Sequence, residues 1–407
     1  MILVAGAGIA GLALGLTLHE LGIPFRVHEK TRALRPLGVG INVQPDAVRE
    51  LWAMGLASEL EAAGVRTRDY GFHTRDGRAI WTEPRGTWAG YRWPQYSIHR
   101  GRLQMILHDA LVARAGPDVL VTGAPATGYD PDGTLYLQGL PPARGALVIG
   151  ADGLHSALRA QMIPDEGPPI WSGRVLWRGT TRAPPFRSGA SMIMAGNDAI
   201  RIVAYPITPP GADGRATINW IAERRLGPMG GTREADWTHA VDPEAIAPRF
   251  ADWRFDWLDV PALIRGAEAV LEYPMVDREP LDRWTCGRVT LMGDAAHPTY
   301  PVGSNGSGQA ILDARTLGRA IREHGPTPEA LEAYEAARRP RTTAIQRANR
   351  GRGPDAIMQL AEDRTGGEFD RMDDLFPMAE RATHAERYKA LAGTSVAALN
   401  AEPPILA

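Results

Sequence analysis

Residues 2–11 of the chain read ILVAGAGIAG, and this stretch decides the fold. Its first four residues, 2–5, form a short apolar run directly before glycines, which is typical of a buried parallel strand. Three glycines follow with the spacing G-x-G-x-x-G. In a turn between a strand and a helix, Gly6 permits the tight turn, Gly8 lets a pyrophosphate approach, and Gly11 allows close helix packing. The stretch therefore predicts a dinucleotide-binding turn.

The residues after this turn supply the context that the glycine pattern requires. A helix is expected over 9–21, and a second buried strand over 25–29. Glu29 ends that strand, where a carboxylate accepts hydrogen bonds from an adenosine ribose. Free N–H groups and the dipole at the start of the helix favour bound phosphates. The motif alone leaves open whether the dinucleotide is FAD or NAD.

Two further motifs follow buried strands later in the chain. Residues 146–150 read ALVIG and lead into a turn that contains Asp152. Residues 288–292 read RVTLM and lead into Gly293 and Asp294. Ligands bind at the carboxyl ends of the strands in such parallel sheets. We therefore expect Asp294 to lie where a ligand binds, whereas the turn with Asp152 is by itself also compatible with a capped strand-to-helix connection.

The composition changes over 171–221, where β-prone runs are broken by Pro, Gly and Asn. This pattern predicts an antiparallel sheet inserted between parts of the nucleotide domain. A β-hairpin is expected over 70–83, with its turn at Asp76 and Gly77. Helices are expected over 45–54, 102–114, 242–267 and 309–323, and from about residue 330 onward.

Composition also narrows the function classes. A chain of 407 residues is too long to fold around one simple hydrophobic core. The formal charge of −2, with scattered basic residues, does not favour binding to nucleic acid. The single cysteine, Cys286, excludes an intramolecular disulfide and fits a reducing cytoplasm. The ten histidines show no metal-ligand spacing, so no metal is expected. The apolar run over 1–18 lacks a basic start and is broken by glycines, which argues against a signal peptide or membrane span.

On these three motifs and their order, the chain resembles the class A flavoprotein monooxygenases, the para-hydroxybenzoate hydroxylase-like family, from residue 1 to about residue 350. Within that family it resembles most the type that hydroxylates 5-methylphenazine-1-carboxylate. The closer resemblance rests on GVGINVQPDAV at 38–48, WPQYSIHRGRLQ at 93–104, RIVAYPI at 201–207 and YPMVDREPL at 273–281.

The resemblance implies FAD as the cofactor. The glycine turn would line its pyrophosphate, Asp294 would bind the ribityl chain, and Arg100 would contact the FAD. The loop 301–308 would run along the isoalloxazine ring, and glycines in 38–41 would permit ring movement. The family often has an asparagine where this chain has Gly308, so that contact is lost or supplied elsewhere. The expected cofactor contacts are Gly6, Gly8, Ala10, Gly11, Glu29, Lys30, Gly40, Ile41, Arg100, Asp152, Gly293, Asp294, Gly303, Asn305 and Gly306.

Pro301 and Tyr205 are the expected catalytic residues. Alternate residues of a strand share a face, so Arg201, Val203 and Tyr205 would point the same way, with Tyr205 at the substrate. His297 is interpreted as a capping or packing residue. An apolar lid over the flavin is expected from Trp177, Met192, Met194, Tyr205 and Trp220.

These features predict an α/β fold: a Rossmann-like FAD-binding domain interleaved with a mixed or antiparallel β-sheet substrate domain, plus C-terminal helices. The FAD-binding domain would comprise 1–70, 97–170 and 280–345, and the substrate domain 71–96 and 171–279. The helical tail, 346–407, is interpreted as packing or dimer surface.

The predicted function is an FAD-dependent monooxygenase that uses NADH or NADPH and O2 to hydroxylate a small aromatic or N-heteroaromatic substrate through a flavin C4a-hydroperoxide. Because no second G-x-G-x-x-G stands between a strand and a helix, the nicotinamide would dock only transiently. A cytoplasmic monomer or homodimer, without membrane or nucleic-acid partners, is expected. Baeyer–Villiger or epoxidising chemistry, an oxygen-independent flavin dehydrogenase, and a catalytically silent flavin-binding protein stay open as alternatives.

Overall fold

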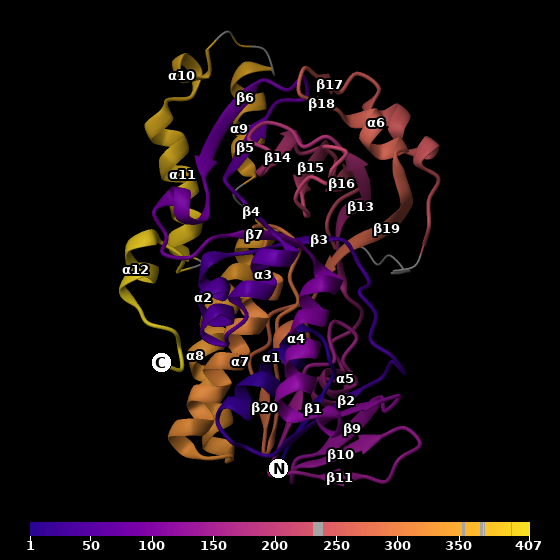
Figure 1. Cartoon of the computed structure of the whole chain (residues 1–407), viewed down its shortest axis with the longest axis vertical. Coiled ribbons are helices and arrows are strands. Elements are labelled where there is room, and N and C mark those ends of the chain that lie inside the picture. Colours follow the sequence, from indigo (N-terminus) through magenta and orange to yellow (C-terminus); the bar gives the residue numbers. More distant parts are fainter. Residues whose placement is uncertain (231–238, 352–354, 367–368, 370, 392) are drawn as a thin grey trace.

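The computed structural model describes residues 1–230, 239–351, 355–366, 369, 371–391 and 393–407. Two large β-sheets organise this part of the chain, one in each half of the molecule (Figure 1). The N-terminus lies in the lower half, and the C-terminal helices run along one side of the molecule. Residues 231–238, which fall within the predicted substrate segment, lie outside the described residues.

The lower half is built on a six-stranded sheet with the order β20-β21-β12-β1-β2-β8. The strands from β21 to β8 run parallel, and β20 is antiparallel to β21. β1, β12 and β21 are buried along their whole length, as expected for the centre of a parallel sheet. Their carboxyl ends lie side by side, which brings the three motifs to one edge. The strands are β1 (Ile2–Ala5), β2 (Phe25–Glu29), β8 (Leu120–Thr122), β12 (Leu147–Gly150), β20 (Thr285–Cys286) and β21 (Val289–Leu291).

Helices and two small sheets complete the lower half. Helix α1 packs against both α4 and α7, and α7 packs against α8. Ten of the twelve residues of α1 are buried, which explains its run of Leu and Ala with little amphipathic character. The helices are α1 (Ile9–Glu20), α2 (Pro45–Ala53), α3 (Ala57–Ala63), α4 (Arg100–Ala115), α5 (Ala157–Met162), α7 (Gly306–His324) and α8 (Pro328–Arg350). The small sheets are β3 (Gly40–Val43) with β7 (Tyr96–His99) and β4 (Val65–Arg66), and β9 (Ala126–Asp130) with β10 (Thr134–Leu137) and β11 (Ala143–Arg144).

The upper half is a seven-stranded sheet with the order β19-β13-β16-β15-β14-β5-β6. Its pairs are antiparallel except β14 with β5, which run parallel, so the sheet is mixed. The predicted hairpin over 70–83 is present as β5 and β6. The strands are β5 (Asp69–His73), β6 (Ala79–Pro84), β13 (Ile170–Ala183), β14 (Ser191–Gly196), β15 (Ile200–Pro206), β16 (Ala216–Arg225) and β19 (Ala267–Asp277).

The two faces of the upper sheet pack against different partners. Along β15, Ile202 and Ala204 belong to a core shared with helix α6 (Val260–Arg265). Val203 and Tyr205 face the other way, into a cluster shared with the C-terminal tail. This alternation follows from the two-residue period of a strand.

The single helix expected over 242–267 is wrong. Two short 3₁₀ turns, at Pro243–Ala245 and Ala247–Phe250, lead to a hairpin of β17 (Arg254–Phe255) with β18 (Leu258–Asp259) and then to α6. Three prolines in this segment lack the N–H that a helix interior needs, and each of the three short helical pieces has one of them as its first or second residue.

The tail forms α9 (Ala356–Thr365), α10 (Met372–Leu375), α11 (Met378–Leu391) and α12 (Val396–Ala401). Figure 1 shows α9 and α11 near the β5–β6 edge of the upper sheet, and α12 beside the lower half. The backbone N–H of Ile405 donates to Glu50 of α2, which ties the end of the tail to the lower half. The domain boundaries given above stay a prediction. Among the described residues, none of the helices combines the length and apolar character of a membrane span.

Candidate active site

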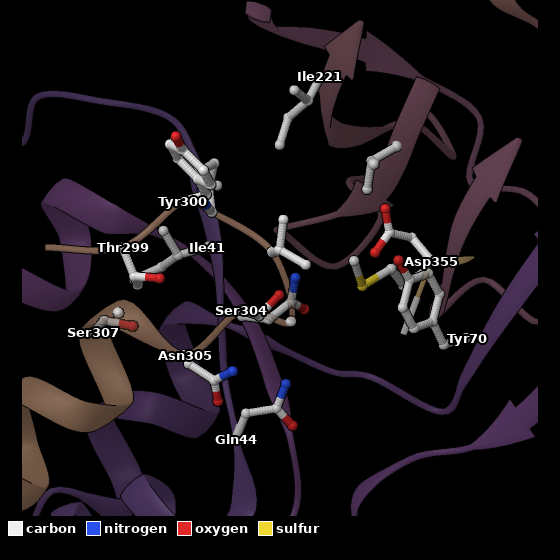
Figure 2. A pocket seen from close by; sticks show the side chains of 18 of the residues that line it. Ile41, Gln44, Tyr70, Ile221, Thr299, Tyr300, Ser304, Asn305, Ser307 and Asp355 are labelled. Atoms are coloured by element: carbon white, nitrogen blue, oxygen red, sulfur yellow. The ribbon is translucent and has the colours of Figure 1, made fainter. Parts of the chain in front are cut away.

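A cavity of about 310 Å³ lies where the two large sheets and the tail meet. The lower half contributes the turn after β1, strand β3 and the loop 299–307; the upper sheet contributes β5, β14 and β15. Figure 2 shows Ser304 and Asn305 on one side of the cavity, with Tyr70 and Asp355 across from them. One half of the cavity therefore belongs to the nucleotide-binding motifs and the other to the inserted sheet.

The structure brings most of the predicted site residues together. Those that line the cavity are Gly8, Ala10, Gly40, Ile41, Arg100, Tyr205, Asp294, Pro301, Gly303, Asn305 and Gly306. Those that do not line it are Gly6, Gly11, Glu29, Lys30, Asp152 and Gly293. Gly6, Gly11, Asp152 and Gly293 belong to the motif turns whose neighbouring residues line the cavity, whereas Glu29 ends β2 and Lys30 follows it.

The glycines of the first turn divide into two kinds. Gly6 has a φ of +103°, and a Cβ there would lie 2.4 Å from the carbonyl oxygen of Ala151. A Cβ on Gly11 would lie 1.9 Å from the carbonyl oxygen of Gly6. The fold itself therefore requires these two glycines. A Cβ on Gly8 would meet no atom within 4 Å, so Gly8 instead leaves its backbone open to the cavity.

Glu29 supports the same turn from β2. Its Oε2 accepts a hydrogen bond from the Ala7 N–H at 2.8 Å, and its Oε1 accepts one from the Thr31 N–H at 2.9 Å. Each carboxylate oxygen offers a second lone pair, so these bonds leave capacity for ribose hydroxyls. The neighbouring Lys30 is exposed.

Two helices begin at the cavity. Helix α1 starts after Gly8 without a capping side chain or an acidic residue in its first turn. Helix α7 starts at Gly306, also without an acidic residue in its first turn, and a Cβ on Gly306 would meet no atom within 4 Å. The first N–H groups of a helix have no partner within it and attract anions. The cavity thus has two electropositive ends, one in each of these turns.

The carboxylates of the second and third motifs differ in their surroundings. Asp152 Oδ2 accepts a hydrogen bond from the Ala157 N–H at 2.8 Å, whereas Asp152 Oδ1 is buried without a partner among the described residues. Burial raises the pKa of Asp152. Asp294 is exposed to the cavity while Gly293 before it is buried. Both motifs therefore offer an acceptor at the cavity or directly behind its wall.

These observations fit a bound FAD. The open backbone at Gly8 and the start of α1 suit a pyrophosphate, and Asp294 suits the hydroxyls of a ribityl chain. The start of α7 suits the pyrimidine edge of a flavin, which carries negative charge when reduced. Asp152 Oδ1, which has no partner among the described residues, can accept a hydrogen bond from a bound ligand. Buried acceptors are rarely left without a donor.

A buried ion-pair network that sequence reasoning missed supports the third motif. Asp313 of α7 is fully buried; its Oδ2 accepts a hydrogen bond from the Gly293 N–H at 2.9 Å and lies 2.6 Å from His297 Nε2. Arg338 Nε lies 2.7 Å from Asp313 Oδ1. Burial alone would raise the pKa of Asp313, but the charges of His297 and Arg338 outweigh it and hold the pKa well below its usual value. The charged carboxylate therefore fixes the turn that presents Asp294.

The loop that contains Gly40 is held from the upper sheet. Asn219 Oδ1 accepts a hydrogen bond from the Gly40 N–H at 2.7 Å, and Arg178 donates one to the Gly40 carbonyl oxygen at 3.1 Å. Burial lowers the pKa of Arg178. Sequence reasoning missed both residues, because they follow Gly40 in the chain by more than a hundred positions.

The half of the cavity on the upper sheet combines aromatic and aliphatic side chains with charged ones. Arg201, Val203 and Tyr205 of β15 all line it, as their spacing predicts. Met192 and Met194 line it as well, but the expected lid is wrong for Trp177 and Trp220. Those two tryptophans pack in the core on the opposite face of the sheet. Their strands, β13 and β16, present them to α6 because strand residues alternate between faces.

The tail packs on the upper sheet, in line with its interpretation as packing surface, and it also contributes to the cavity, which that interpretation did not include. The tail residues that line the cavity are Asp355, Ile357, His384, Ala385 and Lys389, and Figure 2 shows Asp355 across from Ser304 and Asn305. The composition of the tail gave no sign of this role, since alternating Arg, Ala and Glu are typical of any solvated helix. Within the described ranges, no group of three His, Cys, Asp or Glu side chains is placed to hold a metal ion.

Comparison with known proteins identifies the family. Residues 1–349 match the family model described as an FAD binding domain. The phenazine 1,6-dicarboxylic acid hydroxylase PhzS of Lysobacter antibioticus is 46% identical over 363 residues, covering 86% of this chain and 89% of that relative. The 3-amino-4-hydroxybenzoate 2-monooxygenase of Streptomyces cremeus is 34% identical over 362 residues, covering 86% of each.

A solved structure confirms the fold. The Klebsiella pneumoniae protein HpxO, in complex with FAD and uric acid, superposes with a TM-score of 0.74 at 24% identity, covering 97% of this chain and 96% of that one. The α/β fold with C-terminal helices and the resemblance to flavoprotein monooxygenases are thereby confirmed. The chain belongs to the FAD-binding-domain family and is an FAD-dependent monooxygenase, an oxidoreductase of the aromatic hydroxylase type.

Proposed function

We propose that the enzyme hydroxylates a flat N-heteroaromatic compound of the phenazine class, with NADH or NADPH as electron donor and O2 as co-substrate. The observation that carries this proposal is the division of one cavity into a half that fits FAD and a half lined by aromatic and apolar side chains. The relative from Lysobacter antibioticus, which acts on a phenazine dicarboxylic acid, supports the choice of substrate class.

The substrate half suits a planar ring. The rings of Tyr70 and Phe72 lie 4.4 Å apart between centroids, and both line the cavity. Met192, Met194 and Ile221 line it too. Methionine sulfur and aromatic faces make favourable contacts with flat aromatic molecules. These side chains would bind the ring by apolar contact and keep water from it.

FAD, when bound, accepts a hydride from the nicotinamide and activates O2 for transfer to the ring. The chain's own task is to orient the ring against the flavin and to exclude water from the reacting atoms. The loop 301–308 would form the wall beside the flavin. Pro301 carries no titratable group, so we propose that it acts by shaping this wall.

Tyr205 is the polar group that we assign to the substrate. It is 2% exposed, and burial raises its pKa to about 12 against the opposing charge of Arg178. Its hydroxyl therefore stays protonated near neutral pH and is available to donate a hydrogen bond to a ring substituent or ring nitrogen. This role orients the substrate and leaves proton abstraction to other groups or to water.

We further propose that the enzyme works in the cytoplasm, where NADH and NADPH are supplied, as a monomer or homodimer. Light scattering of the purified protein and cell fractionation test these two points. A stable higher oligomer, or recovery of the protein outside the cytoplasm, contradicts them.

The substrate proposal is tested by steady-state assays of the FAD-loaded protein with NADH and with NADPH. Phenazine-1,6-dicarboxylic acid, phenazine and 3-amino-4-hydroxybenzoate are compared as substrates, and products are analysed by mass spectrometry. Faster NAD(P)H oxidation together with a hydroxylated phenazine supports the proposal. If only the benzoate is hydroxylated, or the phenazines yield only hydrogen peroxide, the proposed substrate class is wrong.

A further inference from the structure

We propose that the end of the cavity between strand β6 and tail helix α11 is a carboxylate-binding subsite, in which Arg85 and Lys389 hold a carboxylate on the ring of the substrate. The inference rests on the proposed function of the same cavity and names the substituent that the substrate must carry. It also gives the C-terminal tail a specific role, since Lys389 belongs to α11.

The cavity has an excess of positive charge. Its lining contains five Arg or Lys residues and three Asp or Glu residues, as follows: Arg85, Arg100, Arg178, Arg201 and Lys389 against Glu83, Asp294 and Asp355. A concave site with such an excess attracts anions. An aromatic carboxylate therefore suits it better than a neutral or cationic ring.

Two of these cations, Arg85 and Lys389, lie together at the β6–α11 end. Lys389 Nζ lies 3.0 Å from Glu83 Oε2, and Arg85 is paired with the other oxygen of the same carboxylate. Lys389 Nζ also lies 2.9 Å from Glu386 Oε1, so the two cations meet two carboxylates, of which only Glu83 lines the cavity. The side chains of Arg85 and Lys389 are only 15% and 16% exposed, so water screens them poorly.

Unused hydrogen-bond donors lie at the same place. Arg85 Nε and Trp81 Nε1 are buried and have no partner among the described residues, and both residues line the cavity. Buried donors are rarely left without a partner, because burial deprives them of water. A carboxylate offers several lone pairs and accepts from more than one donor, as this arrangement requires.

The geometry places these donors at the edge of the aromatic wall. The Arg85 guanidinium lies over the Tyr70 ring, with its Cζ 5.0 Å from the ring centroid. A ring that packs against Tyr70 can direct an in-plane carboxylate toward Arg85. The planar fork of a guanidinium matches a carboxylate, which adds orientation to charge.

Two of the other cavity arginines hold segments of the fold together, although the buried Nε of each, like that of Arg85, has no partner among the described residues. Arg201 is paired with Glu223 at 2.8 Å and with Asp355, so it links β15 to the tail. Arg178 donates to the Gly40 carbonyl oxygen on the flavin side. We assign the carboxylate to Arg85 and Lys389 because Arg85 lies over Tyr70 in the aromatic wall of the cavity and Lys389 lies beside it.

The test uses the FAD-loaded full chain and measures ligand binding from the change in flavin absorbance. Phenazine-1-carboxylic acid, its amide and unsubstituted phenazine are titrated into the wild type, Lys389→Gln and Arg85→Gln. Arg387→Gln is the matched control, because Arg387 is an exposed residue of the same helix that does not line the cavity. Arg85→Lys retains the charge without the fork and should recover part of the loss.

The expected result is that the wild type prefers the acid to the amide and that each variant loses on the order of tenfold in affinity for the acid, as for one charge-assisted hydrogen bond. Affinity for the amide should not change, and Arg387→Gln should behave as the wild type. Equal binding of acid and amide by the wild type, or equal losses for both ligands in the variants, overturns the subsite alone. If none of the three phenazines is bound, the proposed substrate class fails with it.

Discussion

His297 Nε2 lies 2.6 Å from Asp313 Oδ2, and the same oxygen accepts the Gly293 N–H. The pair joins the turn after β21, which presents Asp294, to helix α7, which begins at Gly306 directly after a loop that lines the cavity. His297 itself does not line the cavity and packs against Trp284, with ring centroids 5.2 Å apart. His297 is therefore a supporting residue, which stabilises the charged carboxylate of Asp313.

Asp313→Asn removes that charge and leaves Arg338 buried without its carboxylate. Breaking a buried pair in this way costs ~3–5 kcal/mol, so the free energy of unfolding should fall by that amount in urea. FAD affinity should fall as well, because the Gly293 turn loses its acceptor. Asp118→Asn, at an exposed site, is the control and should change neither quantity.

The same carboxylate predicts a dependence of stability on acid. The folded pKa of Asp313 lies below its unfolded value, so the stabilisation is present above the unfolded value and is lost as the pH falls through the folded one. Below about pH 4, the ordinary titration range of an aspartate, the Asp313→Asn variant should therefore lose less stability than the wild type as the pH falls. Identical acid unfolding of variant and wild type would contradict the assignment.

Gly8→Ala and Gly11→Ala should separate cofactor binding from folding. Since a Cβ on Gly8 meets no atom within 4 Å and its φ is −72°, this variant should lose less than ~1 kcal/mol of stability. It should nevertheless bind FAD on the order of tenfold more weakly, because the methyl group occupies the phosphate side of the turn. A Cβ on Gly11 lies 1.9 Å from the Gly6 carbonyl oxygen, so that variant should be destabilised by ~1–3 kcal/mol or more even without FAD. Thermal unfolding and fluorescence titration with FAD measure both effects, and unchanged FAD affinity in Gly8→Ala would refute the placement of the pyrophosphate.

His73 should make the upper sheet sensitive to mild acid. Burial, and then the neighbouring charge of Arg187, lower its pKa from 6.5 to about 4. Between these values the unfolded chain binds a proton that the folded chain does not, so stability should fall by up to ~3 kcal/mol as the pH decreases from 6.5 to 4. His73→Gln should flatten this part of the pH–stability curve. If the curve keeps its slope in the variant, His73 does not titrate as described.

Tyr205→Phe should impair hydroxylation without impairing FAD binding. Loss of a single hydrogen bond to substrate corresponds to a fall on the order of tenfold in kcat/KM. The shape of the pH profile near neutrality should not change, since the pKa of Tyr205 is about 12. Tyr129→Phe is the matched control: Tyr129 is also buried, its pKa is also raised to about 12, and it lies outside the cavity lining. Equal activity of both variants and the wild type would remove Tyr205 from the site.

The sequence predicts the nucleotide half of the fold well because its signals are local. Residues 2–11 carry a buried strand, a turn that only glycine fits and the start of a helix within ten positions. The alternation of Arg201, Val203 and Tyr205 likewise predicts a shared face, and the cavity lining bears this out. The roles of these residues toward FAD and substrate stay predictions.

The features of the site that the sequence does not predict depend on contacts between segments that are distant in the chain. Gly40 meets Arg178 and Asn219 only because the upper sheet folds back onto β3. Lys389 reaches Glu83 across more than three hundred residues. Which face of a strand becomes cavity and which becomes core also depends on the partner, so Trp177 was assigned to the wrong face. Periodicity gives the two faces of an element, and packing decides between them.

The central claim is that the enzyme inserts an atom of O2 into an aromatic ring. Turnover of phenazine-1,6-dicarboxylic acid under isotopically labelled O2, with FAD-loaded enzyme and NAD(P)H, tests it most directly by mass spectrometry of the product. The account predicts a hydroxylated product that carries a single labelled oxygen atom and no product in the absence of O2. A product whose new oxygen comes from water, or oxidation of the substrate without O2, would contradict monooxygenation and favour a dehydrogenase.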